Sequence, residues 1–237
     1  GASNSAFGHL ALHNNTTASS NTAVGYQSLY SNTTSTENVA IGYQALYSQT
    51  TASTGSNTAV GHRAGVSTNG YYNALFGYKS GESSTGNQNT FIGHAAGINM
   101  TSGNKNTIIG AYNGNQGGLD IRTSSNNIVL SDGDGNPRVR VNVIGRVGIN
   151  ETNPQAQLYL SADANTTEPF TVNDTSSSGA TSKHRISFKY QRSEVGSIKA
   201  NNSSTSYNTS SDCRLKENVV EMTGATDRLK QLEPKRF

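Results

Sequence analysis

The stretch Asn21-Thr22-Ala23-Val24-Gly25-Tyr26 carries the pattern on which the first half of the chain is built. Asn comes first, Gly fifth, and Tyr or His sixth in most copies. The seven clear copies and a degenerate eighth begin at Asn4, Asn21, Asn38, Asn57, Asn73, Asn89, Asn106 and Asn127. The glycines of the seven clear copies follow one another at steps of 16 to 19 residues, which chance does not explain.

This step predicts a β-solenoid. It is too short for a two-helix repeat, which takes about 33 residues or more. We expect each coil to contain two short strands and two turns, because Val, Ile and Phe within the copies favour strands. The recurring Gly suits a tight bend, where a positive φ is free for Gly. The segment after it, such as Gln27-Ser28-Leu29-Tyr30, is expected to form the second strand or a corner of the coil.

The composition predicts that several chains share a core. Hydrophobic residues make up 32% and charged residues 14%, against roughly 45–50% and 25% in typical domains. Such a composition is typical of disorder, yet the net charge is only +3 and there are 4 prolines. An ordered chain of this kind buries surface by stacking repeats or by oligomerisation. Three copies side by side bury much more than one, so we expect a homotrimer.

The composition and the distribution of residue types also exclude several functional classes. No apolar run approaches the 18 or so residues of a transmembrane helix, and no signal-peptide pattern follows Gly1. The single cysteine, Cys213, excludes an internal disulfide and a cysteine-based zinc site. Basic residues form no stripe that would follow a phosphate backbone. We therefore expect no membrane insertion, no nucleic-acid partner, no metal and no cofactor.

The middle of the chain has a different rhythm. Residues 128–130 and 139–143 are expected to form a hairpin around a Gly-rich turn at 131–137. We assign 119–160 to a β-hairpin connector and 161–211 to a β-rich trimeric stalk. Short alternating strands are predicted within the stalk at Pro169–Val172, Ile186–Tyr190 and Val195–Ile198.

Three other patterns are best explained without a binding or catalytic site. Asp132-Gly133-Asp134-Gly135-Asn136 imitates the start of a calcium-binding loop, but Val143 stands where that loop needs a glutamate, which favours a polar turn. His and Tyr alternate at the sixth repeat position, which excludes a metal site and favours surface or interchain packing; an aromatic strip for sugar rings is the alternative. A glycosidase needs two carboxylates about 5–10 Å apart. The only acidic residues before residue 132 are Glu37, Glu82 and Asp120.

The repeats over residues 1–118 resemble the head repeats of trimeric autotransporter adhesins, and similar repeats occur in bacteriophage tail fibres. The resemblance implies a left-handed β-roll trimer. The segment Arg146–Leu160 resembles an element that recurs in phage tail fibres before the C-terminal stalk.

The junction Ser211-Asp212-Cys213-Arg214-Leu215-Lys216-Glu217-Asn218 resembles the start of the intramolecular chaperone domain of phage fibres and spikes, a family of self-cleaving peptidases. The resemblance implies one cut between Ser211 and Asp212, with Ser211 as nucleophile and Lys216 as its base. A lysine acts as a base only where burial lowers its pKa from about 10.4. Residues 212–237 are then the beginning of an α+β chaperone domain, most of which lies beyond this chain. We expect a helix through Ala225, Leu229 and Leu232.

Together these features predict an all-β, homotrimeric β-solenoid followed by an intertwined β-stranded stalk. The predicted function is that of a tail fibre or tailspike exposed on a bacteriophage virion. Its partners would be a host cell-surface polysaccharide or protein receptor and other virion tail proteins, and the Ser211/Lys216 pair would act once as a serine endopeptidase. The alternative is a bacterial trimeric surface adhesin, which would continue into a coiled-coil stalk and a membrane anchor. Ser211–Phe237 shows neither.

The junction assignment predicts the outcome of three substitutions in a longer chain that includes the rest of the chaperone domain. Ser211→Ala or Lys216→Ala should leave the chaperone attached, because the hydroxyl or its base is missing. Cys213→Ser should cleave normally, because the family motif leaves this position variable. Mass spectrometry of the mature chains decides the matter: cleavage in Lys216→Ala, or its loss in Cys213→Ser, contradicts the assignment.

Overall fold

The computed structural model describes residues 1–50, 55–161, 183–190, 193–200 and 205–209. The described part is all-β and contains no helix, as predicted. The chain divides into two compact units, Gly1–Phe170 and Thr171–Phe237.

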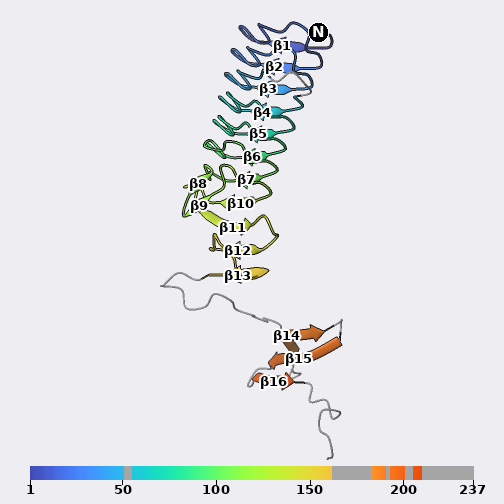
Figure 1. Ribbon diagram of the computed structural model, residues 1–237, viewed down its shortest axis with the longest axis vertical. Coiled ribbons are helices and arrows are strands. Elements are labelled where there is room, and N and C mark those ends of the chain that lie inside the picture. The colour runs from blue at the N-terminus through green and yellow to red at the C-terminus, as the bar shows by residue number, and fades with distance from the viewer. Residues whose placement is uncertain (51–54, 162–182, 191–192, 201–204, 210–237) are drawn as a thin grey trace, which may run out of the picture. The chain divides into compact units, whose positions relative to one another are not determined.

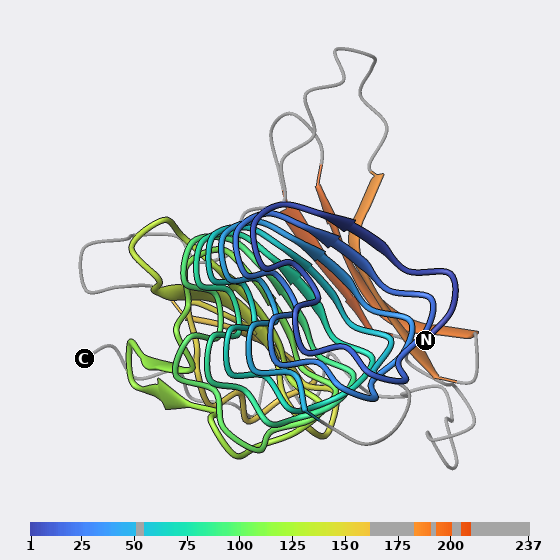
Figure 2. The ribbon, with the colours of Figure 1, turned by 90° about the horizontal axis from the view of Figure 1, so that it is seen from above.

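The first unit is a β-solenoid, which confirms the interpretation of the repeat (Figure 1). Seven three-residue strands stack in parallel and in register, one from each coil, and the coils nest when seen from above (Figure 2). They are β1 (Ser5–Phe7), β2 (Thr22–Val24), β3 (Val39–Ile41), β4 (Thr58–Val60), β5 (Ala74–Phe76), β6 (Thr90–Ile92) and β7 (Thr107–Ile109).

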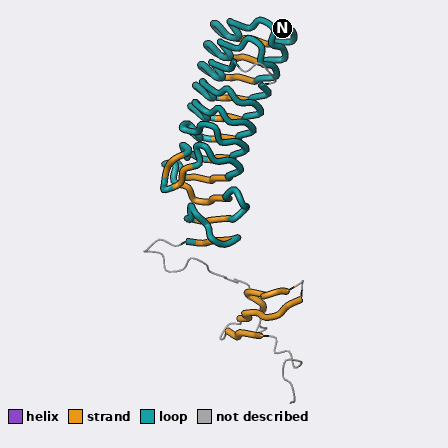
Figure 3. Tube along the Cα trace, in the orientation of Figure 1, coloured by secondary structure: helices purple, strands orange, loops and turns teal. Residues whose placement is uncertain are grey.

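The expectation of two strands per coil is wrong, because each coil has one strand and the rest is turn (Figure 3). The segment after the repeat glycine is a corner. Its backbone alternates into the left-handed region, with φ of 54° at Gln27 and 48° at Leu29, so it cannot run as a strand. The coils still bond to each other there: the Leu29 N–H donates to the Ala45 carbonyl at 3.0 Å.

The asparagine that opens each repeat forms a buried ladder. The Oδ1 of Asn21 accepts hydrogen bonds from the Asn38 backbone N–H (2.9 Å) and the Asn38 Nδ2 (3.1 Å). The bond to the backbone recurs at every step, at 2.9 to 3.0 Å, from Asn4 to Asn127. At the end of the ladder, the Oδ1 of Asn127 accepts from the guanidinium of the half-buried Arg140 (3.0 Å).

The repeat glycines stand where the expected bend requires them. Gly25 has a φ of +124°, and a Cβ there would lie 2.6 Å from the carbonyl oxygen of Gly42. Gly42 has a φ of +132° and meets the carbonyl of Gly61 in the same way. Each position therefore requires glycine for two reasons, its own backbone conformation and the close approach of the next coil.

In the core, the size of the side chain at the strand centre is balanced by the size of the residue at the opposite corner. In the early coils a strand-centre alanine faces a leucine, as with Ala40 and Leu46, both fully buried. Later coils carry a large strand centre, Leu75, Phe91 or Ile108, and a glycine at the corner. A Cβ on Gly65, which follows β4, would lie 2.7 Å from Cδ1 of Leu75 in the next strand, β5, so a corner must be empty where the strand centre of the next coil is large.

The sheet continues past the repeats. The degenerate eighth copy forms β10 (Ile128–Ser131), which pairs in parallel with β7 and antiparallel with β11 (Pro137–Val141) and so confirms the predicted hairpin. Then follow β12 (Val147–Ile149) and β13 (Leu158–Leu160), which complete eleven strands. Between β7 and β10 a small ladder of β8 (Asn115–Gln116) and β9 (Leu119–Asp120) leaves the solenoid wall.

In the second unit the described residues form an antiparallel sheet of β14 (Lys183–Tyr190), β15 (Ser193–Ala200) and β16 (Thr205–Thr209). Two of the strands predicted in this region, Ile186–Tyr190 and Val195–Ile198, lie within β14 and β15. The predicted strand at 169–172 and the helix through Ala225 lie outside the described residues.

Replacing Gly42 with Val should disrupt the solenoid. The positive φ alone costs about 1–3 kcal/mol, and the new Cβ also collides with the backbone of the next coil. Gly133→Ala is the matched control, since nothing lies within 4 Å of a Cβ there and no positive φ is recorded. Thermal unfolding followed by circular dichroism should show a large loss for Gly42→Val only. Equal melting temperatures for wild type and Gly42→Val would contradict this account.

The volume exchange predicts a compensating pair. Leu75→Ala alone should cost about 2–5 kcal/mol by leaving a cavity, and Gly65→Leu alone about 1–3 kcal/mol by overpacking. The double variant should lose at least about 1 kcal/mol less than the sum of the two single losses, because the new leucine at position 65 fills the space that Leu75 leaves and packs against Leu46. Chemical denaturation of the four proteins measures this coupling, and strictly additive losses would show that the two sites do not exchange volume.

Candidate functional site

One face of the eleven-stranded sheet carries an unbroken apolar column. From β2 to β7 the middle residue of each repeat strand is buried in the core and the residue after it points outward, as with buried Ala40 and Ile41, which is 39% exposed. The strand register aligns these outward residues as direct neighbours. This outer apolar column comprises Phe7, Val24, Ile41, Val60, Phe76, Ile92, Ile109, Leu130, Val139, Ile149 and Leu160.

The column is long for a surface feature. Paired strands lie about 4.8 Å apart, and the column crosses all eleven strands of the sheet. Its members include Phe7, which is 77% exposed, and Ile109, which is 44% exposed. Contiguous apolar patches of this kind mark interaction surfaces, whereas single exposed apolar residues do not. The outer face of the sheet is therefore the first candidate site.

The His and Tyr residues of the sixth repeat position form a stacked ladder. Neighbouring ring centroids lie 4.8 to 5.5 Å apart with interplanar angles of 6° to 19°. The rings belong to His9, Tyr26, Tyr43, His62, Tyr78 and His94. A shorter second ladder contains His13, Tyr30 and Tyr47.

The stacking assigns these rings a packing role. Each inner ring has a parallel ring on both sides, at a separation that leaves no room for a sugar, so only ring edges face solvent. A strip that stacks sugar rings on aromatic faces is not present here. Aromatic pairs contribute about 0.5–1.5 kcal/mol each, and His and Tyr exchange freely because both are flat rings. The rings therefore pack on each other between coils of one chain, where surface or interchain packing was expected.

The three acidic residues before residue 132 each bind a neighbouring side chain. Glu82 binds Arg63 (2.7 Å) and Lys79 (3.5 Å), and Asp120 binds Arg122 (2.8 Å). The Arg122 side chain holds the pKa of Asp120 below its usual value by hydrogen bonding. Glu37 accepts a hydrogen bond from the Ser56 hydroxyl at 2.9 Å. Each of these carboxylates therefore has its own local partner.

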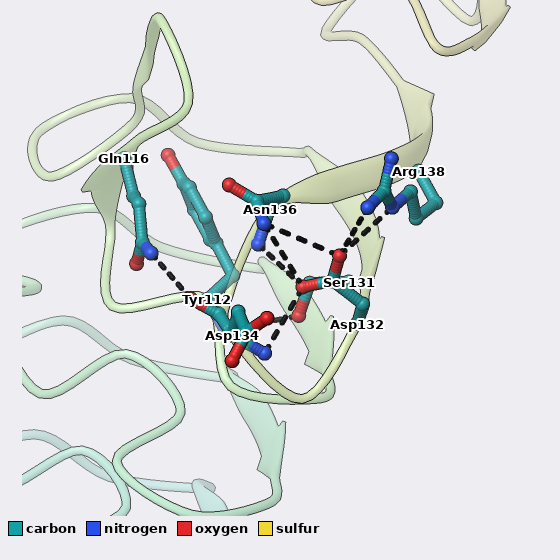
Figure 4. Close-up of polar contacts among 7 residues, drawn as sticks. All are labelled: Tyr112, Gln116, Ser131, Asp132, Asp134, Asn136 and Arg138. Atoms are coloured by element: carbon teal, nitrogen blue, oxygen red, sulfur yellow. Dashed lines mark hydrogen bonds and ion pairs between the residues drawn. The ribbon is translucent and has the colours of Figure 1, made fainter.

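The turn at 131–137 is closed by its own side chains (Figure 4). The Asp132 carboxylate accepts from the Asn136 backbone N–H (2.8 Å), the Asp134 N–H (3.1 Å) and the Arg138 Nε (2.9 Å). The Asn136 N–H, followed by hydrogen bonds from Arg138 and the Asn136 side chain, lowers the pKa of Asp132 to about 2. These bonds hold a polar hairpin turn, as predicted. In the described residues no cluster of three or more His, Cys, Asp or Glu side chains could hold a metal.

Tyr112 is a structural residue that the sequence interpretation missed. Its side chain is fully buried, and its hydroxyl lies 2.9 Å from the Gly114 carbonyl and 2.8 Å from the Leu119 carbonyl. Burial, helped by the charge of Asp120, raises the pKa of the hydroxyl well above its usual value. Gln116 then reaches the Asp134 carbonyl at 2.5 Å and joins the β8–β9 ladder to the turn (Figure 4). The sequence feature that could have indicated this insertion is the step of 21 residues between Asn106 and Asn127, which is longer than the steps before it.

The predicted catalytic residues Ser211 and Lys216 lie outside the described residues, as does Cys213. The last described strand, β16, ends at Thr209. The structure therefore neither brings Ser211 and Lys216 together nor separates them, and the cleavage site stays a prediction.

No protein-family model matches the chain, and neither the characterised proteins nor the solved structures include a match. Among the described residues, no helix has the length and apolar character needed to span a membrane.

Proposed function

We propose that this chain is a segment of a homotrimeric bacteriophage tail fibre or tailspike that attaches the virion to the surface of its host. The outer apolar column carries the proposal. It gives a rigid solenoid a continuous apolar face, which a single chain leaves in water.

The geometry of the column favours self-association along its length. Its residues project from strands of one sheet at a constant step, so a partner that matches them must present an equally regular surface. A second and a third copy of the same sheet do so, and cyclic symmetry keeps the copies parallel. Burial of apolar surface stabilises association by roughly 25 cal/mol per Å². The low apolar content of the chain agrees with a core that is completed between chains.

The remaining parts of the proposal rest on the sequence. Ser211 and Lys216 would release the C-terminal chaperone by one cut between Ser211 and Asp212 after assembly. This cut also distinguishes a phage fibre from a bacterial trimeric adhesin, which would share the solenoid and the apolar column but would keep its C-terminal anchor.

The oligomeric state tests the proposal. Light scattering of the purified chain at micromolar concentration should give three times the 25.0 kDa mass of one chain. Ile92→Asp should lower the trimer affinity at least tenfold, because it introduces a charge in the middle of the column on every chain. Asn99→Asp places the same charge at an exposed position outside the column and should leave the trimer intact.

Circular dichroism of Ile92→Asp should retain the β spectrum of the wild type, because Ile92 does not contribute to the core of the single solenoid. A folded wild-type monomer at micromolar concentration, or a trimer that tolerates Ile92→Asp, would overturn the proposal.

A further inference from the structure

A polar groove lies along the corners that precede β5, β6, β7 and β10. It has a volume of about 420 Å³, within the ~300–1,000 Å³ of small-molecule sites. Side chains from successive coils line it, chiefly Tyr71, Asn87, Gln88, Asn104, Lys105 and Asn126. None of its lining residues belongs to the aromatic ladders or to the Asp132 turn.

The stacking of the coils builds this groove. The Tyr71 N–H donates to Asn87 Oδ1 at 3.0 Å, and the Asn87 N–H donates to Asn104 Oδ1 at 2.8 Å. These bonds fix one amide side chain per coil along the floor. The next residue of each coil, Gln88 or Lys105, has a left-handed φ of 59° or 56° and an exposed side chain. The groove therefore presents amide groups in a row on a rigid backbone.

One end of the groove has a partly exposed aromatic ring, that of Tyr71. Tyr71 and Tyr72 meet edge to face, with centroids 5.2 Å apart and an interplanar angle of 88°. Tyr71 is 40% exposed and, unlike the ladder rings, has no recorded parallel neighbour among the described residues. A flat apolar face beside hydrogen-bonding amides suits a sugar ring, whose C–H face is apolar and whose rim carries hydroxyls.

The charge of the groove is positive. Lys105 is exposed and makes no salt bridge with any of the residues that the structure describes, and no acidic side chain lines the groove. The recorded salt bridge of the other lysine in the described solenoid, Lys79, is to Glu82. A single unneutralised ammonium group favours a ligand with one carboxylate at that point, whereas a nucleic acid would need a row of cations.

We propose that this groove binds an acidic polysaccharide, with a sugar carboxylate at Lys105 and a sugar ring against Tyr71. The amides of Asn87, Asn104 and Gln88 hydrogen-bond the hydroxyls between them. The inference deepens the proposed function, on which it rests, because it names the chemical class of surface receptor that the fibre recognises.

An array of bacterial capsular and lipopolysaccharide glycans of defined structure, acidic and neutral, tests this inference with the full chain. The wild type should bind at least one glycan that contains uronic or sialic acid and should lose at least tenfold affinity for its carboxyl-reduced form. Lys105→Gln and Tyr71→Ala should each weaken binding at least tenfold. Two matched controls, Lys79→Gln and Tyr159→Ala, remove the same groups outside the groove and should bind as the wild type does.

Melting temperatures and light scattering of the same samples separate the two proposals. A trimer that binds no acidic glycan, or that still binds it after both groove substitutions, would contradict the proposal for the groove but not the proposal of a trimeric fibre. A monomer that binds acidic glycans through Lys105 and Tyr71 overturns the trimeric fibre and supports the groove.

Discussion

The rest of the structure depends on the hydrogen bond that each repeat asparagine makes to the coil after it. A turn-rich coil with one three-residue strand has few backbone partners of its own. The buried Asn side chain supplies one acceptor and one donor at the point where the chain enters the strand, and so fixes the register of Asn38 on Asn21 and of every later coil. An unpaired amide in that place would cost about 1–3 kcal/mol in each coil.

The register fixed in this way explains the features on the outside of the solenoid. Once Ala23 stands over Ala40, the residues on either side of them must also align, so Ile41 joins the outer apolar column and Tyr43 joins the ring ladder. The same alignment places Asn87 over Asn104 in the polar groove. The outer apolar column, the stacked rings and the polar groove thus share one cause, the constant step from coil to coil.

The solenoid was predictable from the sequence because its signals are periodic, and the deviations from it were not. The Asn and Gly positions predicted the coil and its bend, and Ile128–Leu130 predicted the hairpin. The segment after Gly25 was expected to be a second strand or a corner, and it is a corner, because the backbone there turns left-handed, with a φ of 48° at Leu29 that the residue type does not indicate. The groove escaped notice because Gln88 and Lys105 share no residue type, only a place in the coil.

The hydrogen bond between Arg140 and Asn127 has an electrostatic consequence. All the ladder carbonyls accept from the following coil, so their dipoles point the same way and add, as peptide dipoles do in a helix. The accumulated negative end falls on the Oδ1 of Asn127, where a guanidinium 3.0 Å away neutralises it. Arg140 therefore acts toward the solenoid as a cation acts at the C-terminus of a helix: it marks where the parallel stack ends and where the antiparallel strands begin.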